Sequence, residues 1–455
     1  MNPDIVILLP GLVGSVLSKD GRDIWNYSGA AGWRLKFDNA LQQLELHAPE
    51  DETLDDLGDG VTARALIDDL VLIPYLCKWG GYSDLTGGLL DRKGLVHGRN
   101  FFQFPYDWRR SNRVSARKLA ERAHGWLSKW RTASGNADAR IVFIAHSMGG
   151  LVARYFIECL EGWKVTRCLV SIGTPFRGSG NAVSFLCNGF TMGPGPLAFD
   201  GTEALRSFDS VYQLLPIYPF VSLPGLTDPV RIRDVDLPNI DRGRAIEAAE
   251  FHQQVTEAVK ANARIEAYLA IGSIVRPIVG TDQSTNESAK LKGGKLEILK
   301  SHPSGTHMGD GTVPRVSASP IDLDEKYCTY IPNQHSLLQS DSACINHLHG
   351  VLTAQAINDA KFRASDEHPI DLSVGEVQLA SDPIVIAATP FRYVQYLEAS
   401  IKNMDRPGDI VTTRLTPTGE NEEYRAEVRL GAGAFQIEVT GQGLRPVRDV
   451  LMVVD

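Results

Sequence analysis

Residues 141–162 read IVFIAHSMGGLVARYFIECLEG, and this stretch constrains the fold more than any other part of the chain. A continuous apolar run of strand length enters a Ser-Met-Gly-Gly corner, and the residues after the corner have helical periodicity. A sharp strand-to-helix turn exposes a serine hydroxyl beside backbone N–H groups that can hold an oxyanion. The pattern small-x-Ser-x-Gly is weak alone, but this context favours Ser147 as a nucleophile over a structural turn.

Short β-branched runs alternate with helical patterns over most of the chain. Residues 4–10, 140–146 and 165–175 are typical of buried strands, whereas residues 117–131 carry apolar residues at helical spacing. The segments RIEAYLAIGSIV (264–275) and KYCTYIPN (326–333) are also predicted to be strands. Alternating strands and helices predict an α/β fold with a mainly parallel sheet covered on both faces.

The same patterns predict two domains. We assign residues 1–360 to the α/β domain, with insertions at about 20–100 and 185–245 that have the length and apolar content of a lid or substrate-binding cap. The alternative for the insertions is a subdomain that only packs on the core. Residues 366–455 contain short alternating strands separated by turn residues, which predicts a small antiparallel β-sandwich of unknown role.

A nucleophilic serine requires a base, and the base requires a carboxylate that orients it. When a serine of this kind lies on an α/β sheet, the chain order is serine, acid, histidine. Asp310 lies between two glycines in GDGTVP, and His335 follows a predicted strand in NQHSLL, so we predict these two as acid and base. A turn aspartate is the alternative for Asp310, since Asp and Gly are common in turns.

The other histidines fit the role of base less well. His302 and His307 lie in a polar loop before the acid, and His347 and His349 lie in a predicted helix. His146 adjoins the serine but would point away from a nucleophile at the apex of the turn.

The oxyanion of an acyl-transfer intermediate is held by two backbone N–H groups. The helix start after Ser147 offers the N–H of Met148, where the helix dipole also favours negative charge. The second donor usually follows an early strand, and in LLPGLVGS the Pro-Gly pair points to the N–H of Leu12. The alternative for LLPGLVGS is a simple turn that ends the strand.

Net charge and cysteine content limit the partners and the cellular compartment that we expect. The net charge is −9 at pH 7, whereas a general nucleic-acid surface is normally basic, so no nucleic-acid partner is expected. The six cysteines show no CxxC spacing, which favours free, mostly buried thiols in a reducing compartment. No apolar run is long enough to span a membrane, and the N-terminal segment fits a secretory leader poorly, so we expect a cytoplasmic protein.

Several motifs together resemble the lecithin–cholesterol acyltransferase-like family of α/β-hydrolases, a phospholipase/acyltransferase family, in its bacterial form. They are VILLPGLVGSVL, FPYDWRRSN, IVFIAHSMGGLVARYF, IGTPFRGS, GDGTVP and NQHSLL, in that order over roughly residues 4–355. The resemblance implies Ser147 as nucleophile, Asp310 as acid and His335 as base. It also implies an oxyanion hole formed by Leu12 and Met148. Asp107 and Arg109 look structural, as a buried charge pair.

We therefore expect a serine esterase or lipase that hydrolyses acyl esters of lipids through an acyl-enzyme, without a metal or organic cofactor. Two alternatives stay open: a lipid O-acyltransferase that uses the same acyl-enzyme, and a partner-regulated effector in which the C-terminal domain mediates recruitment or self-assembly. Peripheral contact of the cap with a membrane is a further hypothesis.

Overall fold

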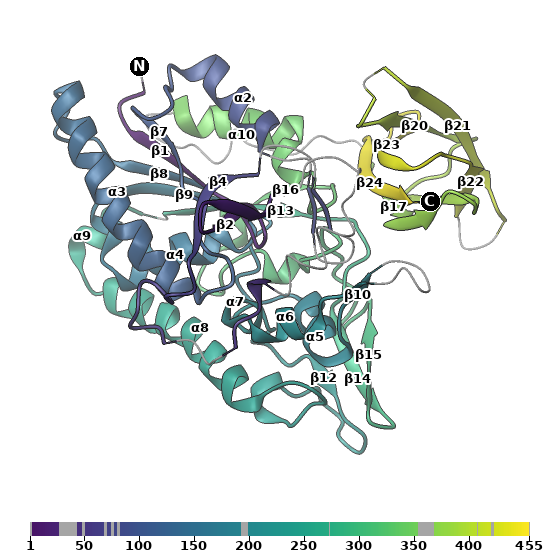
Figure 1. The fold of residues 1–455 in the computed structure, drawn as a ribbon, viewed down its shortest axis with the longest axis horizontal. Coiled ribbons are helices and arrows are strands. Elements are labelled where there is room, and N and C mark those ends of the chain that lie inside the picture. Colours follow the sequence, from purple (N-terminus) through teal and green to yellow (C-terminus); the bar gives the residue numbers. More distant parts are fainter. Residues whose placement is uncertain are drawn as a thin grey trace.

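The computed structural model carries a central six-stranded sheet and a separate C-terminal β-sheet (Figure 1). The structure describes residues 2–26, 43–47, 51–67, 71–73, 77–79, 82–192, 199–272, 274–353, 368–406, 408–419 and 423–454.

The central sheet has the strand order β16-β13-β9-β8-β1-β7, and every adjacent pair is parallel. Its strands are β1 (Ile5–Leu9), β7 (Phe101–Gln103), β8 (Ile141–His146), β9 (Thr166–Ile172), β13 (Val275–Gly280) and β16 (Thr329–Ile331). Every residue of β1 and β8 is buried, as expected for strands covered on both faces. The predicted α/β fold with a parallel sheet is confirmed.

Helices cover both faces of this sheet. On one side, α3 (Asn112–Ser134) and α4 (Gly149–Cys159) pack against the strands and against each other, and α8 (Arg242–Asn262) packs against α4. On the other side, α2 (Ser83–Lys93) and α10 (Ser342–Thr353) lie side by side (Figure 1). No helix among the described residues is both long and apolar enough to cross a membrane.

One predicted strand is partly a helix. Of RIEAYLAIGSIV, residues Glu266–Leu269 form α9, and the strand β13 begins only at Val275. The four residues of α9 have no buried member, so the apolar residues there do not lie in the sheet. A short apolar run does not distinguish strand from helix, which explains the error.

The two insertions form small elements around the C-terminal edge of the sheet. The strand β2 (Ser15–Lys19) leads into the first, which contains β3 (Arg22–Trp25), β4 (Val61–Leu66), β5 (Val71–Ile73) and β6 (Cys77–Trp79). The second contains β10 (Thr191–Met192), β11 (Phe199–Asp200), α6 (Thr202–Ser207), α7 (Asp209–Tyr212) and β12 (Val221–Ser222), after α5 (Gly180–Asn188). The strand β14 (Ser288–Lys292) pairs with β12, and β15 (Lys295–Leu299) pairs with β14. Residues 27–42, 48–50, 68–70, 74–76, 80–81 and 193–198 of the two insertions lie outside the described residues.

The C-terminal region is all β, as predicted, and has a hydrophobic core of its own. Its strands are β17 (Ile370–Val374), β18 (Val377–Leu379), β19 (Ile384–Pro390), β20 (Leu397–Asn403), β21 (Ile410–Pro417), β22 (Tyr424–Val428), β23 (Gly433–Thr440) and β24 (Val447–Val454). They form one continuous sheet in the order β17-β19-β22-β21-β20-β23-β24-β18. The two halves are joined where β21 pairs with β22. The pair β18–β24 is parallel, which differs from the expected antiparallel arrangement.

The segment Pro-Tyr-Asp-Trp-Arg ties the first insertion to the core. The Arg109 side chain is fully buried and donates from Nη2 to Asp107 Oδ2 over 2.6 Å and to Asp59 Oδ2 over 2.8 Å. Its Nη1 donates to the carbonyl of Leu44. The predicted buried charge pair is therefore present, and it serves packing because it makes no contact with Ser147.

Candidate active site

Ser147 lies on a tight turn between β8 and α4. Its φ is +52°, a left-handed conformation that non-glycine residues rarely adopt and that is often found at functional sites. The Ser147 N–H donates to the carbonyl of Ile172 on the neighbouring strand β9. The turn is therefore anchored to the sheet, with the serine at the C-terminal end of the strands, where sites of open α/β sheets are found.

The glycine after Met148 lets the helix approach the sheet. A Cβ on Gly149 would lie 2.4 Å from the carbonyl oxygen of Pro10, closer than real Cβ atoms come. The strand β1 therefore ends directly against the start of α4. This contact brings the loop after β1 next to Ser147.

Ser147, His335 and Asp310 form a hydrogen-bonded row. The distance from Ser147 Oγ to His335 Nε2 is 3.0 Å, and the distance from His335 Nδ1 to Asp310 Oδ2 is 2.7 Å. A carboxylate accepts only, so His335 donates its Nδ1–H to Asp310 and leaves Nε2 to accept the serine proton. All three side chains are buried, with Ser147 at 9% exposure. The residues predicted from three distant parts of the sequence are thus adjacent.

The predicted acid and base are held by backbone groups of their own loops. The other carboxylate oxygen of Asp310, Oδ1, accepts the N–H groups of Thr312 and Val313 at 3.0 and 2.7 Å. The His335 N–H donates to the Asp310 carbonyl over 2.7 Å. Gly173 makes room for the pair, because a Cβ there would lie 2.9 Å from His335 Nδ1. Both side chains are therefore held before any substrate arrives.

The predicted oxyanion donors lie at the site. Leu12 lines the same pocket as Ser147, and Met148 follows the serine at the start of α4. Within the described part of the chain, neither the Leu12 nor the Met148 N–H has a hydrogen-bond partner. The preceding amide, Gly11 N–H, is already used, since it donates to Tyr82 Oη over 2.9 Å. This contact excludes Gly11, whereas the N–H groups of Leu12 and Val13 keep no partner among the described residues, and Leu12 is the one of the two that lines the pocket.

The loop after β1 is strained like the serine turn. Val13 has a φ of +59°, which is rare for a β-branched residue. The Gly14 N–H closes the turn onto the carbonyl of Gly11, and the Trp25 indole N–H donates to the carbonyl of Val13. Strain of this kind persists only where surrounding contacts impose it.

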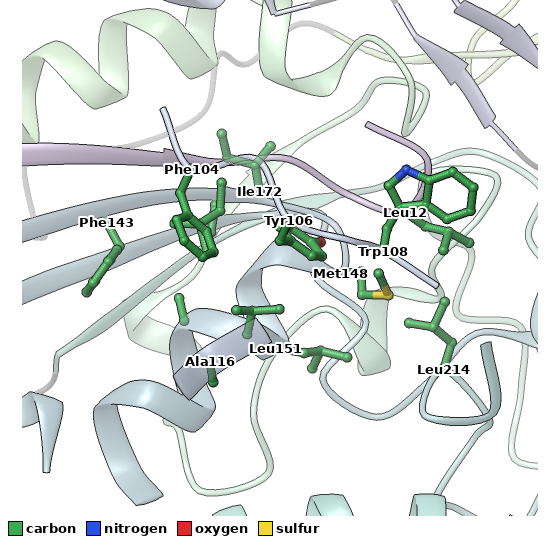
Figure 2. Close-up of a cluster of buried hydrophobic side chains, with 14 of the residues drawn as sticks. Leu12, Phe104, Tyr106, Trp108, Ala116, Phe143, Met148, Leu151, Ile172 and Leu214 are labelled. Atoms are coloured by element: carbon green, nitrogen blue, oxygen red, sulfur yellow. The ribbon is translucent and has the colours of Figure 1, made fainter. Parts of the chain in front are cut away.

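A mainly apolar pocket opens above Ser147. It is lined by Leu12, Phe185, Val211, Leu214 and Val313 with Ser147, His335 and five smaller or polar side chains, and its volume is about 40 Å³. Figure 2 shows Leu12, Met148 and Leu214 gathered beside the Trp108 indole. Phe185 comes from α5, and Val211 and Leu214 come from the second insertion. The predicted cap region therefore contributes walls of this pocket.

His146, which precedes the serine, belongs to a buried bridge that the sequence did not predict. Its Nε2–H donates to the His335 carbonyl over 3.3 Å, and the Tyr82 O–H donates to its Nδ1 over 3.2 Å. Burial, with the nearby His335, holds the pKa of His146 well below its usual range, so the imidazole is neutral. Because Tyr82 also accepts from Gly11, the bridge joins the loop of Leu12 to the main chain of the base.

The competing histidines have other partners. His302 contacts Ser304 Oγ and the Pro219 carbonyl, and His307 also contacts Ser304 Oγ. In α10, His347 contacts Thr329 and His349 contacts the Gly88 carbonyl. These contacts keep all four imidazoles away from Ser147.

The cysteines whose side chains the structure describes are not activated nucleophiles. The described cysteine side chains, Cys159, Cys168, Cys187, Cys328 and Cys344, form no disulfides. Desolvation raises the pKa of each thiol, to about 12 for Cys168 and about 11 for Cys328. A thiol with a raised pKa carries almost no thiolate near neutral pH. Among the described residues, no cluster of side chains has the composition of a metal site.

Two residues beside the triad were missed by sequence reasoning. Tyr82 precedes α2 and reaches the loop after β1 from far along the chain. Gln283 is fully buried between the acid and the C-terminal domain. A lone tyrosine or glutamine carries no periodic signal, so no local pattern in the sequence could have indicated either residue.

Comparison with known proteins finds a family that part of this chain resembles. Residues 81–273 match the family model of lecithin:cholesterol acyltransferase, which confirms the resemblance drawn from the motifs. The matched segment contains Ser147 and Met148, whereas Leu12, Asp310 and His335 lie outside it.

Two curated relatives match short segments. A lecithin-cholesterol acyltransferase-like 4 protein of Arabidopsis thaliana is 34% identical over 104 residues, which is 22% of this chain and 18% of that protein. An uncharacterized protein of Saccharomyces cerevisiae is 33% identical over 95 residues, 21% of this chain and 13% of its own length. The chain thus spans less than a fifth of the length of these relatives.

Among solved structures, the Bacillus licheniformis lipase BlEst2 in propeptide form aligns with 99% of this chain and 94% of its own, at 10% identity and a TM-score of 0.32. The phospholipase PlaB from Legionella pneumophila, in complex with thio-NAD, aligns with 99% of this chain and 89% of its own, also at 10% identity and 0.32. TM-scores this low do not establish a shared fold.

Proposed function

We propose that this chain, whose residues 81–273 match the lecithin:cholesterol acyltransferase family model, is a serine hydrolase of lipid acyl esters. One observation carries the proposal. Ser147 Oγ, on a strained turn, is 3.0 Å from His335 Nε2, while Nδ1 of the same ring is 2.7 Å from Asp310. A serine, a histidine and a carboxylate in this order are the parts of a nucleophile activated by a general base.

In the proposed reaction, Ser147 Oγ attacks the ester carbonyl while His335 Nε2 takes the hydroxyl proton. The imidazolium that forms is stabilised by Asp310 across their short hydrogen bond. The N–H groups of Leu12 and Met148 stabilise the tetrahedral oxyanion, and their lack of other partners in the described chain supports this role. His335 then protonates the leaving alcohol, and water attacks the resulting acyl-enzyme with His335 as base.

The pocket supports an apolar acyl group. Its walls are mostly apolar, and the large side chains of Leu12, Phe185 and Leu214 offer apolar surface to an acyl chain. A volume of about 40 Å³ holds only a few waters, so side chains of the cap must move before a fatty acyl chain enters. We therefore propose that the second insertion, which forms the cap, moves away from the pocket. In this open position the cap would also contact a lipid surface.

Transfer of the acyl group to an alcohol is the second candidate, and the family match favours it. Hydrolysis and transfer share every step up to the acyl-enzyme and differ only in whether water or an alcohol attacks it.

Incubation with a phospholipid, with and without a long-chain alcohol, tests the function and separates the candidates. A hydrolase releases fatty acid in both reactions, whereas a transferase also forms the fatty acyl ester of the alcohol. Ser147→Ala is the control and should do neither. If the wild-type chain releases no fatty acid from phospholipid or simple acyl esters, the proposal is wrong.

A further inference from the structure

The C-terminal domain contacts the loops that carry the acid and the base. Its strand β17 is the first strand in the order of its sheet, so one of its edges has no neighbouring strand in that sheet. Gln283 Nε2 donates to the Ile370 carbonyl of β17 over 3.0 Å, and the Leu372 N–H donates back to Gln283 Oε1 over 3.4 Å. One glutamine side chain thus pairs with this edge as a short strand would.

The main chain of Gln283 holds the loop of the acid. Its N–H donates to the Gly309 carbonyl over 2.9 Å, and the Gly309 N–H donates to its carbonyl over 3.0 Å. Gly309 directly precedes Asp310. Gln283 therefore joins the acid, through its backbone, to β17, through its amide.

The residue before the base completes the connection. Gln334 Nε2 lies 2.9 Å from Gln283 Oε1 and 3.1 Å from the Leu372 carbonyl, and it donates to both. His335 follows directly, and its own N–H is bonded to Asp310. The loops of Asp310 and His335 are thus both tied to β17: Gln283 bonds Ile370 and Leu372, and Gln334 bonds Leu372.

A second connection holds the other end of the histidine loop. Arg445 of the C-terminal domain donates to Asp341 Oδ1 over 3.0 Å, and both side chains are about nine-tenths buried. The second oxygen of Asp341 accepts from Asn333 Nδ2 over 2.8 Å. Asn333 Oδ1 in turn accepts the N–H of Gln334 over 2.8 Å. Breaking a buried pair leaves an unpaired charge, so this contact resists separation of the two domains.

We propose that the C-terminal domain is a positioning element of the active site: through Gln283 and Arg445 it sets the loop that carries His335. The inference rests on the proposed function, because it assigns the contacts a role in base-catalysed attack by Ser147. Gln283 and Arg445 touch no reacting atom and act through the loop. A shift of about 1 Å in a catalytic group can cost on the order of a hundredfold in rate, so these distant contacts matter.

Three single substitutions in the full-length protein test the proposal. Gln283→Met keeps the volume but removes the amide, and Arg445→Gln breaks the contact with Asp341. The matched control is Ser284→Ala. It removes the Ser284 Oγ–Asp371 Oδ2 hydrogen bond of 3.0 Å between the same two domains, at an exposed position whose side chain bonds Asp371 and not the histidine loop. Thermal unfolding shows which variants are folded.

Two measurements are made on each folded variant. The first is hydrogen exchange of the peptide covering 332–341, followed by mass spectrometry. The second is reaction with a fluorophosphonate, analysed as its apparent affinity KI and its maximal rate of phosphonylation. We expect exchange about tenfold faster and phosphonylation at least about tenfold slower in Gln283→Met and Arg445→Gln. KI should change by less than about twofold, because the substrate pocket is untouched.

The outcomes separate the alternatives. The proposal is overturned if folded Gln283→Met and Arg445→Gln keep wild-type exchange and phosphonylation, or if Ser284→Ala reproduces their loss. If Gln283→Met does not fold, Arg445→Gln decides alone. If the wild-type protein never reacts with the probe, the proposed function fails, and the exchange measurements still decide whether the C-terminal domain holds the loop.

Discussion

The serine side of the site and the acid–base side meet across 3.0 Å, but they are held in different ways. Ser147 is fixed by its immediate neighbours: a buried strand before it, a helix after it and a bond to the adjacent strand β9. Asp310 and His335 lie on loops, and their positions depend on residues distant in the sequence, including Gln283 and the C-terminal domain.

This difference shows which contacts position the side chains of the site. A nucleophile built into regular secondary structure is placed by the same forces that fold the sheet. Loop residues need separate hydrogen bonds, and each buried bond that is lost costs free energy. The acid–base side is therefore the side that a neighbouring domain can adjust.

The largest effect should come from the serine side. Ser147→Ala removes the nucleophile, so kcat for ester hydrolysis should fall by about 10⁶-fold, with the fold unchanged. Steady-state hydrolysis of a chromogenic ester measures this. His302→Ala is a matched substitution of a histidine outside the triad and should keep wild-type kcat. A Ser147→Ala variant with substantial activity contradicts the role of the turn.

On the acid–base side, Asp310→Asn should lower kcat by about 10⁴-fold. The amide keeps the shape but no longer stabilises the imidazolium of His335, and it favours the wrong tautomer. Pre-steady-state release of the alcohol product should show that acylation itself is slowed. If acylation proceeds at the wild-type rate, Asp310 has no catalytic role and is a structural residue of its turn.

Acidification should lower the stability of the folded protein, because two buried histidines must keep a neutral ring. Burial lowers the pKa of His252 to about 4, and it also lowers the pKa of His146 in the bridge between the two sides. The unfolded chain, with a histidine pKa near 6.5, binds more protons than the folded chain below that pH, so stability present above about 6.5 is lost on acidification. For His252 the loss between pH 7 and 5 is about 2 kcal/mol.

Urea unfolding at pH 7 and pH 5 measures this loss. His252→Gln should reduce the difference between the two pH values, as should His146→Gln. An unchanged pH dependence in both variants contradicts neutral, buried imidazoles at these positions.

The smallest effect should come from the bridge itself. Tyr82→Phe removes the hydroxyl that accepts from Gly11 and donates to His146, so the Leu12 loop loses one anchor. The expected cost is about tenfold in kcat, or about 1.4 kcal/mol in the transition state, with little change in KM. Tyr106→Phe is the matched control, because it removes a buried hydroxyl bond to the Pro10 carbonyl on the other side of the same loop turn. A Tyr82→Phe variant with wild-type kcat shows that the bridge does not position the oxyanion donors.

The serine side and the acid–base side also differ in how well their residues could be predicted from the sequence. The strand, turn and helix around Ser147 follow from local patterns, and the parallel sheet follows from fully apolar runs such as β1 and β8. Asp310 and His335 were found from chain order, since nothing local distinguishes a catalytic aspartate from a turn aspartate. The sequence missed Tyr82 and Gln283 because their partners lie 71 and 87 residues away in the chain. Segment 264–275 was misassigned because a short apolar run fits both a strand and a helix.

In the proposed mechanism, Ser147 is a nucleophile activated by His335 and Asp310. Peptide mapping by mass spectrometry after treatment of the full-length protein with a fluorophosphonate tests it most directly. We expect one adduct, on Ser147, that is absent in Ser147→Ala and forms far more slowly in Asp310→Asn. An unlabelled wild-type protein, or an adduct on any other residue, would contradict it.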